Sequence, residues 1–435
     1  MSHYYLWTIG CQMNQADSQH LSNYLESQGF QPAASMESAD LVLLNSCVVR
    51  QSAEDRVTHQ LASLKALKDA NPSMVIGLTG CLVDSNIPQL QKRFPQVDVF
   101  FGPQAFGNLE EWMAERSVTR MAPTRHPACS RNGELVEGQA QPPASTAFVP
   151  VIQGCDSFCT YCVVPFRRGR EKSRPIAEIA CEVKEMVSRG VKEVTLLGQK
   201  VDAYGHDLPD AQDLADLLTE LNTINGLSRI RFLTSHPQHI TTRLIDTIAR
   251  LDKVCEHINL PVQSGDDGML KAMRRGYTVQ EYRELIDRIR STIRGVSLST
   301  DVIVGFPDET EEQFQHTLEL IQEIRFDSVH VARYSPRPGT WATRHLKDNV
   351  PHSIKRAHKK LLEATQSKIS LEINQQLLGK NVEILVEGIE KDKWRGRTRT
   401  DKLVFFPDTV DHTGQLLQVK IEKASPWWLE GSVSF

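Results

Sequence analysis

The sequence contains no apolar run of the roughly 20 residues that a membrane-spanning helix needs. Its first residues show no charged segment followed by a long apolar one, so we expect no secretory signal. The chain also lacks a strong excess of either charge, since 50 Lys and Arg stand against 54 Asp and Glu. A nucleic-acid partner would therefore have to meet a local basic patch. These absences predict a cytoplasmic protein with no membrane contact.

What is present fits a multidomain globular protein. At 435 residues the chain is too long for one ordinary core, so two or three domains are expected. Apolar residues make up 40% and charged residues 24%, as in typical globular domains. Nine cysteines in a reducing compartment are more often metal ligands or buried thiols than disulfides.

Three of these cysteines, Cys155, Cys159 and Cys162, are spaced at i, i+4 and i+7. They follow an apolar, strand-like run at residues 148–153. Thiolates bind iron–sulfur clusters, which usually take four of them, so three ligands would leave one iron open. Zinc or a purely structural use is the alternative, but zinc would want a fourth ligand, and no histidine occurs between Cys155 and Arg174. A basic, glycine-containing loop follows, which could hold an anionic partner or be merely solvated.

A second group of cysteines is predicted from topology. Three apolar runs in the first part of the chain read as buried parallel strands, at residues 4–10, 40–46 and 74–80. Each is followed directly by a cysteine: Cys11, Cys47 and Cys81. Helical patterns follow at residues 18–28, 53–70 and 87–93. Right-handed crossovers would bring the three strand ends to one sheet edge, where such folds bind ligands. The alternative is that each cysteine is a small buried hydrophobe.

The rest of the chain alternates strand and helix signals and then turns to short strands. Strand candidates lie at residues 148–153, 193–198, 229–234, 257–262, 297–304 and 328–334, and helical patterns at residues 177–189, 211–222, 242–250, 279–292 and 311–324. Six such units predict a partial (β/α)6 barrel. We therefore expect an α/β protein with a parallel-sheet domain over residues 1–120, the barrel over 141–371 and a small β-barrel over 372–435.

The last domain carries a basic segment interleaved with aromatic side chains. Its cations include Lys393, Arg395, Arg397 and Arg399, and Trp394 lies among them. Cations for phosphates beside rings for stacking suit single-stranded or looped RNA. The alternative is a solvated charged edge strand whose aromatic residues belong to the core.

The stretch from Cys155 to Cys162 resembles the CxxxCxxC loop of radical S-adenosylmethionine enzymes. Over its whole length the chain is similar to the methylthiotransferase family of these enzymes, with an N-terminal methylthiotransferase domain, a radical core and a TRAM domain. The stretches that carry the resemblance are Gly10-Cys11-Gln12-Met13-Asn14 with Asp17-Ser18, Arg168-Gly169-Arg170-Glu171 with Ser173-Arg174, Leu260-Pro261-Val262-Gln263-Ser264-Gly265, Ile303-Val304-Gly305-Phe306-Pro307 and Gly396-Arg397-Thr398.

This resemblance implies an enzyme that methylthiolates carbon 2 of isopentenyl-adenosine next to the anticodon of tRNA. It implies two 4Fe–4S clusters, with Cys155, Cys159 and Cys162 as the catalytic set and Cys11, Cys47 and Cys81 holding a cluster that carries the sulfur. S-adenosylmethionine would be cleaved at the first cluster, and candidate contacts to it are Gln199, Gln263, Ser264 and Asp301. Lys393, Arg395, Arg397 and Arg399 would contact the tRNA. An electron donor such as flavodoxin or ferredoxin and a sulfur donor are implied, and we expect a monomer.

Two related substrates and one other class of protein remain alternatives. Relatives act on threonylcarbamoyl-adenosine in tRNA or on an aspartate of a ribosomal protein, and the latter branch usually has a Lys-Asn pair where this chain has Met13-Asn14. A non-catalytic, metal-containing RNA-binding protein is the third possibility. One departure from the family is Lys200, where asparagine is common.

Overall fold

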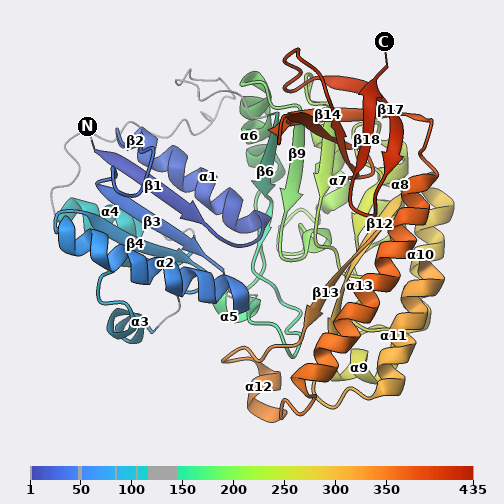
Figure 1. Cartoon of the computed structure of the whole chain (residues 1–435), viewed down its shortest axis with the longest axis horizontal. Coiled ribbons are helices and arrows are strands. Elements are labelled where there is room, and N and C mark those ends of the chain that lie inside the picture. Colours follow the sequence, from blue (N-terminus) through green and yellow to red (C-terminus); the bar gives the residue numbers. More distant parts are fainter. Residues whose placement is uncertain (1, 48–50, 84–85, 104–105, 116–144, 435) are drawn as a thin grey trace. The chain divides into compact units, whose positions relative to one another are not determined.

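The computed structural model describes residues 2–47, 51–83, 86–103, 106–115 and 145–434. The chain divides into two compact units, one made of residues 1–136 with 163–170 and the other of residues 137–162 with 171–435 (Figure 1). The expected domain boundaries at 120 and 141 lie outside the described residues. Within the described part of the chain, no helix is long and apolar enough to cross a membrane.

The first unit is built on a five-stranded sheet of order β2-β1-β3-β4-β5, and every pair of neighbouring strands is parallel. The strands are β1 (His3–Thr8), β2 (Gln31–Pro32), β3 (Leu41–Ser46), β4 (Val75–Gly80) and β5 (Val99–Phe101), and the helices are α1 (Gln12–Ser27), α2 (Gln51–Ala70), α3 (Ile87–Arg93), α4 (Phe106–Glu115) and α5 (Val164–Arg168). Helices α1 and α4 pack on one face, and α2 and α3 on the other, each over its own apolar cluster. The parallel-sheet α/β domain is thus confirmed.

The second unit begins with six parallel strands arranged in chain order. Strands β6, β9 and β10 form one sheet and β11, β12 and β13 another, and a bridge between Ile230 and Val254 joins the two. These strands are β6 (Thr146–Pro150), β9 (Glu193–Leu197), β10 (Arg229–Phe232), β11 (His257–Asn259), β12 (Ser297–Val304) and β13 (Ser328–Arg333). Their side chains pack with those of the surrounding helices in one large core. The predicted partial barrel is therefore confirmed.

The helices of this unit are α6 (Ile176–Ser188), α7 (Leu214–Asn222), α8 (Thr242–Arg250), α9 (Asp267–Ala272), α10 (Val279–Thr292), α11 (Glu311–Ile324), α12 (Trp341–His345) and α13 (His352–Gln375), with a 3-10 turn at Val201–Ala203. Four of them follow a threonine whose side-chain oxygen accepts an N–H from the first turn: Thr241, Thr278, Thr310 and Thr340. Such caps fix the first residue of a helix. Helix α13 lies alongside α11 and β13 (Figure 1).

The chain ends in a closed barrel of order β14-β15-β16-β18-β17. Its strands are β14 (Asn381–Glu390), β15 (Lys393–Thr398), β16 (Leu403–Phe406), β17 (Leu416–Ala424) and β18 (Leu429–Val433). The basic segment of the sequence analysis is strand β15, which turns Trp394 into the barrel core and its cationic side chains outward. Successive side chains of a β-strand point to opposite faces, so the charged residues of β15 point outward and the residues between them point inward.

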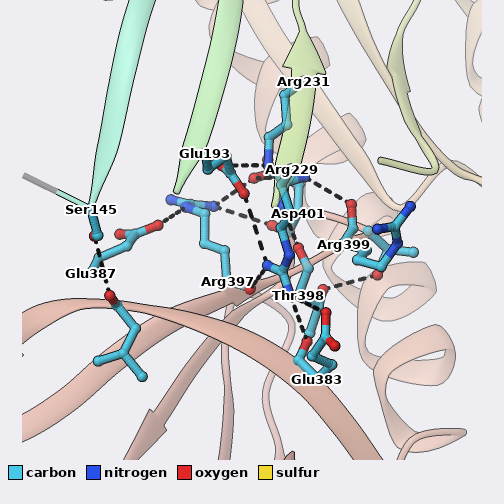
Figure 2. A network of polar contacts seen from close by, with 12 residues as sticks. Ser145, Glu193, Arg229, Arg231, Glu383, Glu387, Arg397, Thr398, Arg399 and Asp401 are labelled. Carbon is cyan, nitrogen blue, oxygen red and sulfur yellow. Dashed lines mark hydrogen bonds and ion pairs between the residues drawn. The ribbon is translucent and has the colours of Figure 1, made fainter. Parts of the chain in front are cut away.

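Buried arginines join this small barrel to the larger one (Figure 2). Arg229 donates to the carbonyl oxygen of Arg397 at 2.7 Å and to the Glu383 carboxylate at 2.8 Å. Arg231 binds Glu193 at 2.7 Å and donates to the carbonyl oxygen of Thr398 at 2.5 Å. Guanidinium groups present several donors in a fixed plane, so each can bind a carboxylate and a backbone carbonyl together.

Candidate metal centres

The first unit brings Cys11, Cys47 and Cys81 to one edge of its sheet. Strands β1, β3 and β4 are adjacent, and the last residues of β3 and β4 are paired in register, so the cysteines after them are neighbours. The amide of Cys81 donates to the carbonyl oxygen of Ser46 at 2.8 Å. Burial raises the pKa of the Cys81 thiol to about 11, Arg168 lowers it, and Cys47 and Cys11 raise it again. The Cys81 thiol therefore lies near the thiols of both Cys47 and Cys11.

A tightly packed glycine and two buried asparagine side chains lie beside these cysteines. A side chain on Gly10 would put its Cβ 2.8 Å from the Cβ of Cys47 and 2.4 Å from Asn14 Oδ1, so only glycine fits. Cys11 Sγ contacts Asn14 Oδ1 at 3.4 Å, and Asn14 Nδ2 donates to Asn45 Oδ1 at 3.0 Å. Both asparagines are buried. Such partners behind a ligand set fix the orientation of the ligands.

A charged side chain from far along the sequence reaches the same thiols. Arg168 Nε lies 3.3 Å from Cys81 Sγ, and its NH2 group lies 2.8 Å from Asp17 Oδ2. The side chains of Arg168 and Asp17 are each 5% exposed. Sequence reasoning listed both residues as parts of motifs and gave neither a role, because their contact depends on tertiary structure.

In the second unit, Cys155, Cys159 and Cys162 lie on the loop that leaves the short strand β7 (Ile152–Gln153), which pairs with β8 (Lys172–Ser173). The amide of Cys162 donates to the carbonyl oxygen of Cys159 at 3.0 Å. Thr160 holds the loop against the end of α9, where its side chain donates to a backbone carbonyl oxygen at 2.9 Å. Arg275 lies 3.4 Å from Cys159 Sγ through its NH1 group.

Lys200, the departure from the family pattern, is part of this loop's support. Its Nζ lies 2.9 Å from Glu171 Oε1 and donates to Ser157 Oγ at 3.0 Å. The side chains of Lys200 and Glu171 are 6% and 8% exposed. Burial raises the pKa of Cys155, whereas hydrogen bonds from Ser157 and the charge of Lys200 lower it. A cation thus supports the thiolate form of Cys155.

Each set of three thiols has the donor chemistry of an iron–sulfur cluster. Within the described ranges, no three His, Cys, Asp or Glu side chains are close enough to hold one metal ion together. In an iron–sulfur cube each thiolate binds a different iron, so its ligands need not meet at one point. Thiols outside any disulfide, with cations beside Cys81 and Cys159, fit such a group. The ligand roles of all six cysteines remain predictions.

The four candidate S-adenosylmethionine contacts lie on three segments: Gln199 after β9, Gln263 and Ser264 between β11 and α9, and Asp301 in β12. Gln199 follows β9, and its Oε1 is buried with no hydrogen-bond partner among the described residues. Gln263 has a positive φ of 73° and donates its amide to the carbonyl oxygen of Asp301 at 2.8 Å. Ser264 is fully buried, 3.3 Å from the hydroxyl of Thr317 on α11, which suits a structural role. Their roles stay predictions.

A polar group that sequence reasoning missed lies where β9 and β10 end. Asp202 Oδ2 accepts the amide of His236 at 2.6 Å. Burial raises the pKa of Asp202 to about 8 and lowers that of His236 to about 2, and Arg275 lowers the latter further. Asp202 Oδ1, Ser235 Oγ and His236 Nε2 are buried without a partner in the described part of the chain. At neutral pH these are uncharged donors and acceptors, which suit a nucleoside.

The four predicted RNA contacts all have carboxylate neighbours. Their ion pairs are Lys393 with Glu430, Arg395 with Glu387 and Glu390, Arg397 with Glu387 and Asp401, and Arg399 with Glu256. Lys393 and Arg395 keep side chains that are 43% and 42% exposed. Arg399 also donates to the carbonyl oxygen of Val254, which ties it to the larger barrel.

Comparison with known proteins covers the whole chain. The model of the Radical SAM superfamily matches residues 149–321, that of Uncharacterized protein family UPF0004 matches residues 3–102, and that of the TRAM domain matches residues 375–434. A protein of Dehalococcoides mccartyi is 51% identical over 100% of this chain and 99% of its own. One of Herpetosiphon aurantiacus is 46% identical over 99% and 97%. Both are named tRNA-2-methylthio-N(6)-dimethylallyladenosine synthase.

Among solved structures, the radical S-adenosylmethionine methyltransferase TsrM from Kitasatospora setae, with cobalamin and a 4Fe–4S cluster bound, shares the fold with a TM-score of 0.56. It is 15% identical, and the match covers 87% of this chain and 79% of that one. The cobalamin-dependent radical enzyme OxsB matches with a TM-score of 0.52 and 12% identity, over 85% of this chain and 55% of that one. At these identities the likeness concerns the fold alone.

Proposed function

The chain belongs to the family of tRNA-2-methylthio-N(6)-dimethylallyladenosine synthases, and from this membership we propose its reaction. It is a radical S-adenosylmethionine enzyme that transfers a methylthio group to carbon 2 of isopentenyl-adenosine in tRNA. The observation that carries the proposal is the pair of three-thiol sites, one at the sheet edge of the first unit and one on the loop after β7. A single ordinary metal site would need only one of them.

We assign one 4Fe–4S cluster to each set, with Cys155, Cys159 and Cys162 holding the first and Cys11, Cys47 and Cys81 the second. When bound, the clusters and S-adenosylmethionine supply the electron, the hydrogen abstraction and the sulfur, which acid–base groups cannot supply at this aromatic carbon. The protein's own part is to orient these groups and to exclude competing reactions.

Several side chains of the second unit carry out that part. Lys200, which donates to Ser157 Oγ, lowers the pKa of Cys155, and the Arg275 guanidinium lies beside Cys159 Sγ. Asp202 and His236 keep uncharged polar atoms inside the barrel, where they can hydrogen-bond an adenosyl group without adding charge. Gln199 lies on the same loop as Lys200 and stays a candidate for a cofactor contact.

For the tRNA, the family supports the substrate class, and side-chain exposure separates the four predicted contacts. Lys393 and Arg395 are the better candidates for phosphate contacts, because their side chains are nearly half exposed. The Arg399 side chain is also used at the junction of the two barrels, where Arg397 contributes only its carbonyl oxygen. An electron donor, a sulfur donor and a monomeric state complete the proposal, and we place the reaction in the cytoplasm.

Mass spectrometry of tRNA nucleosides tests this function. A deletion strain should lack 2-methylthio-isopentenyl-adenosine and accumulate isopentenyl-adenosine. The wild-type gene should restore the product, whereas Cys155→Ala and Cys81→Ala variants should not. Loss of the methylthio group from threonylcarbamoyl-adenosine instead would contradict the proposal and favour the related tRNA enzyme.

A further inference from the structure

Arg168 is an unusual residue to find beside the thiols of the first unit. It ends helix α5, yet its guanidinium group is buried with Asp17 and lies 3.3 Å from Cys81 Sγ. Burying a charge is costly unless the charge is paired and hydrogen-bonded. Asp17 provides one partner, and the sulfur of Cys81 is the second that the structure shows.

The charge of the Cys81 sulfur determines how strong its hydrogen bond with Arg168 is. A neutral thiol is a weak hydrogen-bond acceptor, so it offers a buried guanidinium little. A thiolate bound to a cluster is negative and accepts a charge-assisted hydrogen bond, which is about twice as strong as a neutral one. The arrangement therefore makes most physical sense with Cys81 as a ligand, and with Asp17 fixing the arginine in place.

We propose that Arg168, held by Asp17, is a positioning residue that sets the reduction potential of the cluster in the first unit. Hydrogen bonds and net charge around the sulfurs are among the factors that tune such potentials. Because the reduced cluster carries one more negative charge than the oxidised one, a buried cation bonded to its ligand stabilises the reduced form. The inference rests on the ligand set proposed above.

This inference also gives the motif Arg168-Gly169-Arg170-Glu171 a physical meaning. Arg168 supports the thiols of the first unit, while Glu171 pairs with Lys200 beside the cysteine loop of the second. One short segment, which starts six residues after Cys162, thus places Arg168 beside a thiol of the first set and Glu171 in an ion pair near the second.

The test isolates one cluster by changing Cys155, Cys159 and Cys162 to Ala. In this background the midpoint potential is measured by an anaerobic redox titration followed by electron paramagnetic resonance, and iron is counted beside it. Arg168→Gln should shift the midpoint to a more negative value. Arg168→Lys, which keeps the charge but loses the planar fork, should shift it less.

The matched control is Arg170→Gln, which removes the same charge from an exposed neighbouring residue and should leave the midpoint unchanged. An unchanged midpoint in Arg168→Gln with the cluster still bound would overturn the inference. If Arg168→Gln loses its iron, Arg168→Met in the same background decides, since it also removes the charge and an unchanged midpoint there overturns the inference. If the variant that lacks Cys155, Cys159 and Cys162 binds no cluster at all, Cys11, Cys47 and Cys81 are not cluster ligands. This result would contradict the proposed function, whereas an unchanged midpoint would contradict only the role of Arg168.

Discussion

Replacing Arg231 by methionine should destabilise the second unit strongly. Its side chain is 4% exposed, and its partner Glu193 is 5% exposed. The change leaves the Glu193 carboxylate buried without its closest cation, and it removes the donors to the carbonyl oxygens of Thr398 and Arg399. Removing one partner of a buried ion pair costs about 3–5 kcal/mol, and the orphaned carbonyls act in the same direction.

The assay is urea unfolding of the purified chain, followed by circular dichroism and by proteolysis of the C-terminal barrel. The matched control is Arg243→Met. Arg243 forms ion pairs with Asp213 and Asp216, and its side chain is 55% exposed. Exposed pairs are worth about 1 kcal/mol or less, so this variant should barely move the midpoint. Equal, small shifts in both variants would refute the view that the buried arginines hold the two barrels together.

Two further predictions concern buried ionisable groups near the cysteine loop. Burial raises the pKa of Asp202 from 3.8 to about 8. Between these pH values the folded chain holds a proton that the unfolded chain releases. The free energy of unfolding should therefore fall by roughly 1.4 kcal/mol for each unit by which the pH rises. Asp202→Asn should remove this dependence in thermal melts, and parallel curves for both proteins would argue against it. Lys200→Met should cost about 3 kcal/mol because it leaves Glu171 unpaired, and adding Glu171→Gln should recover most of that in the same melts.

Elements with regular patterns and local caps were predictable from sequence. Helices α8, α10 and α11 begin and end where the apolar period predicted, because a threonine cap and an apolar stripe mark each of them. Strand β12 also has its predicted bounds, residues 297–304. The convergence of strand-end cysteines followed from topology alone, since parallel neighbours end at one edge.

Elements whose buried faces are polar were missed. Helix α13 buries Lys355, His358, Gln366 and Asn374, so it shows no clear apolar stripe. The charged residues of strand β15 alternate with its buried ones, so the segment shows no apolar run that would mark it as a strand. The supporting residues at the candidate sites were also out of reach, because Arg168 finds Cys81 across 87 positions of sequence. Such contacts belong to tertiary structure and leave no local signal.

The central claim is that each three-thiol set holds its own cluster. The most direct measurement is the iron and sulfide content of anaerobically purified protein, beside a variant in which Cys11, Cys47 and Cys81 are all Ala. The account predicts about eight irons per chain, falling to about four in the variant. About four in both proteins would mean that the strand-end cysteines are buried thiols, and would contradict the account.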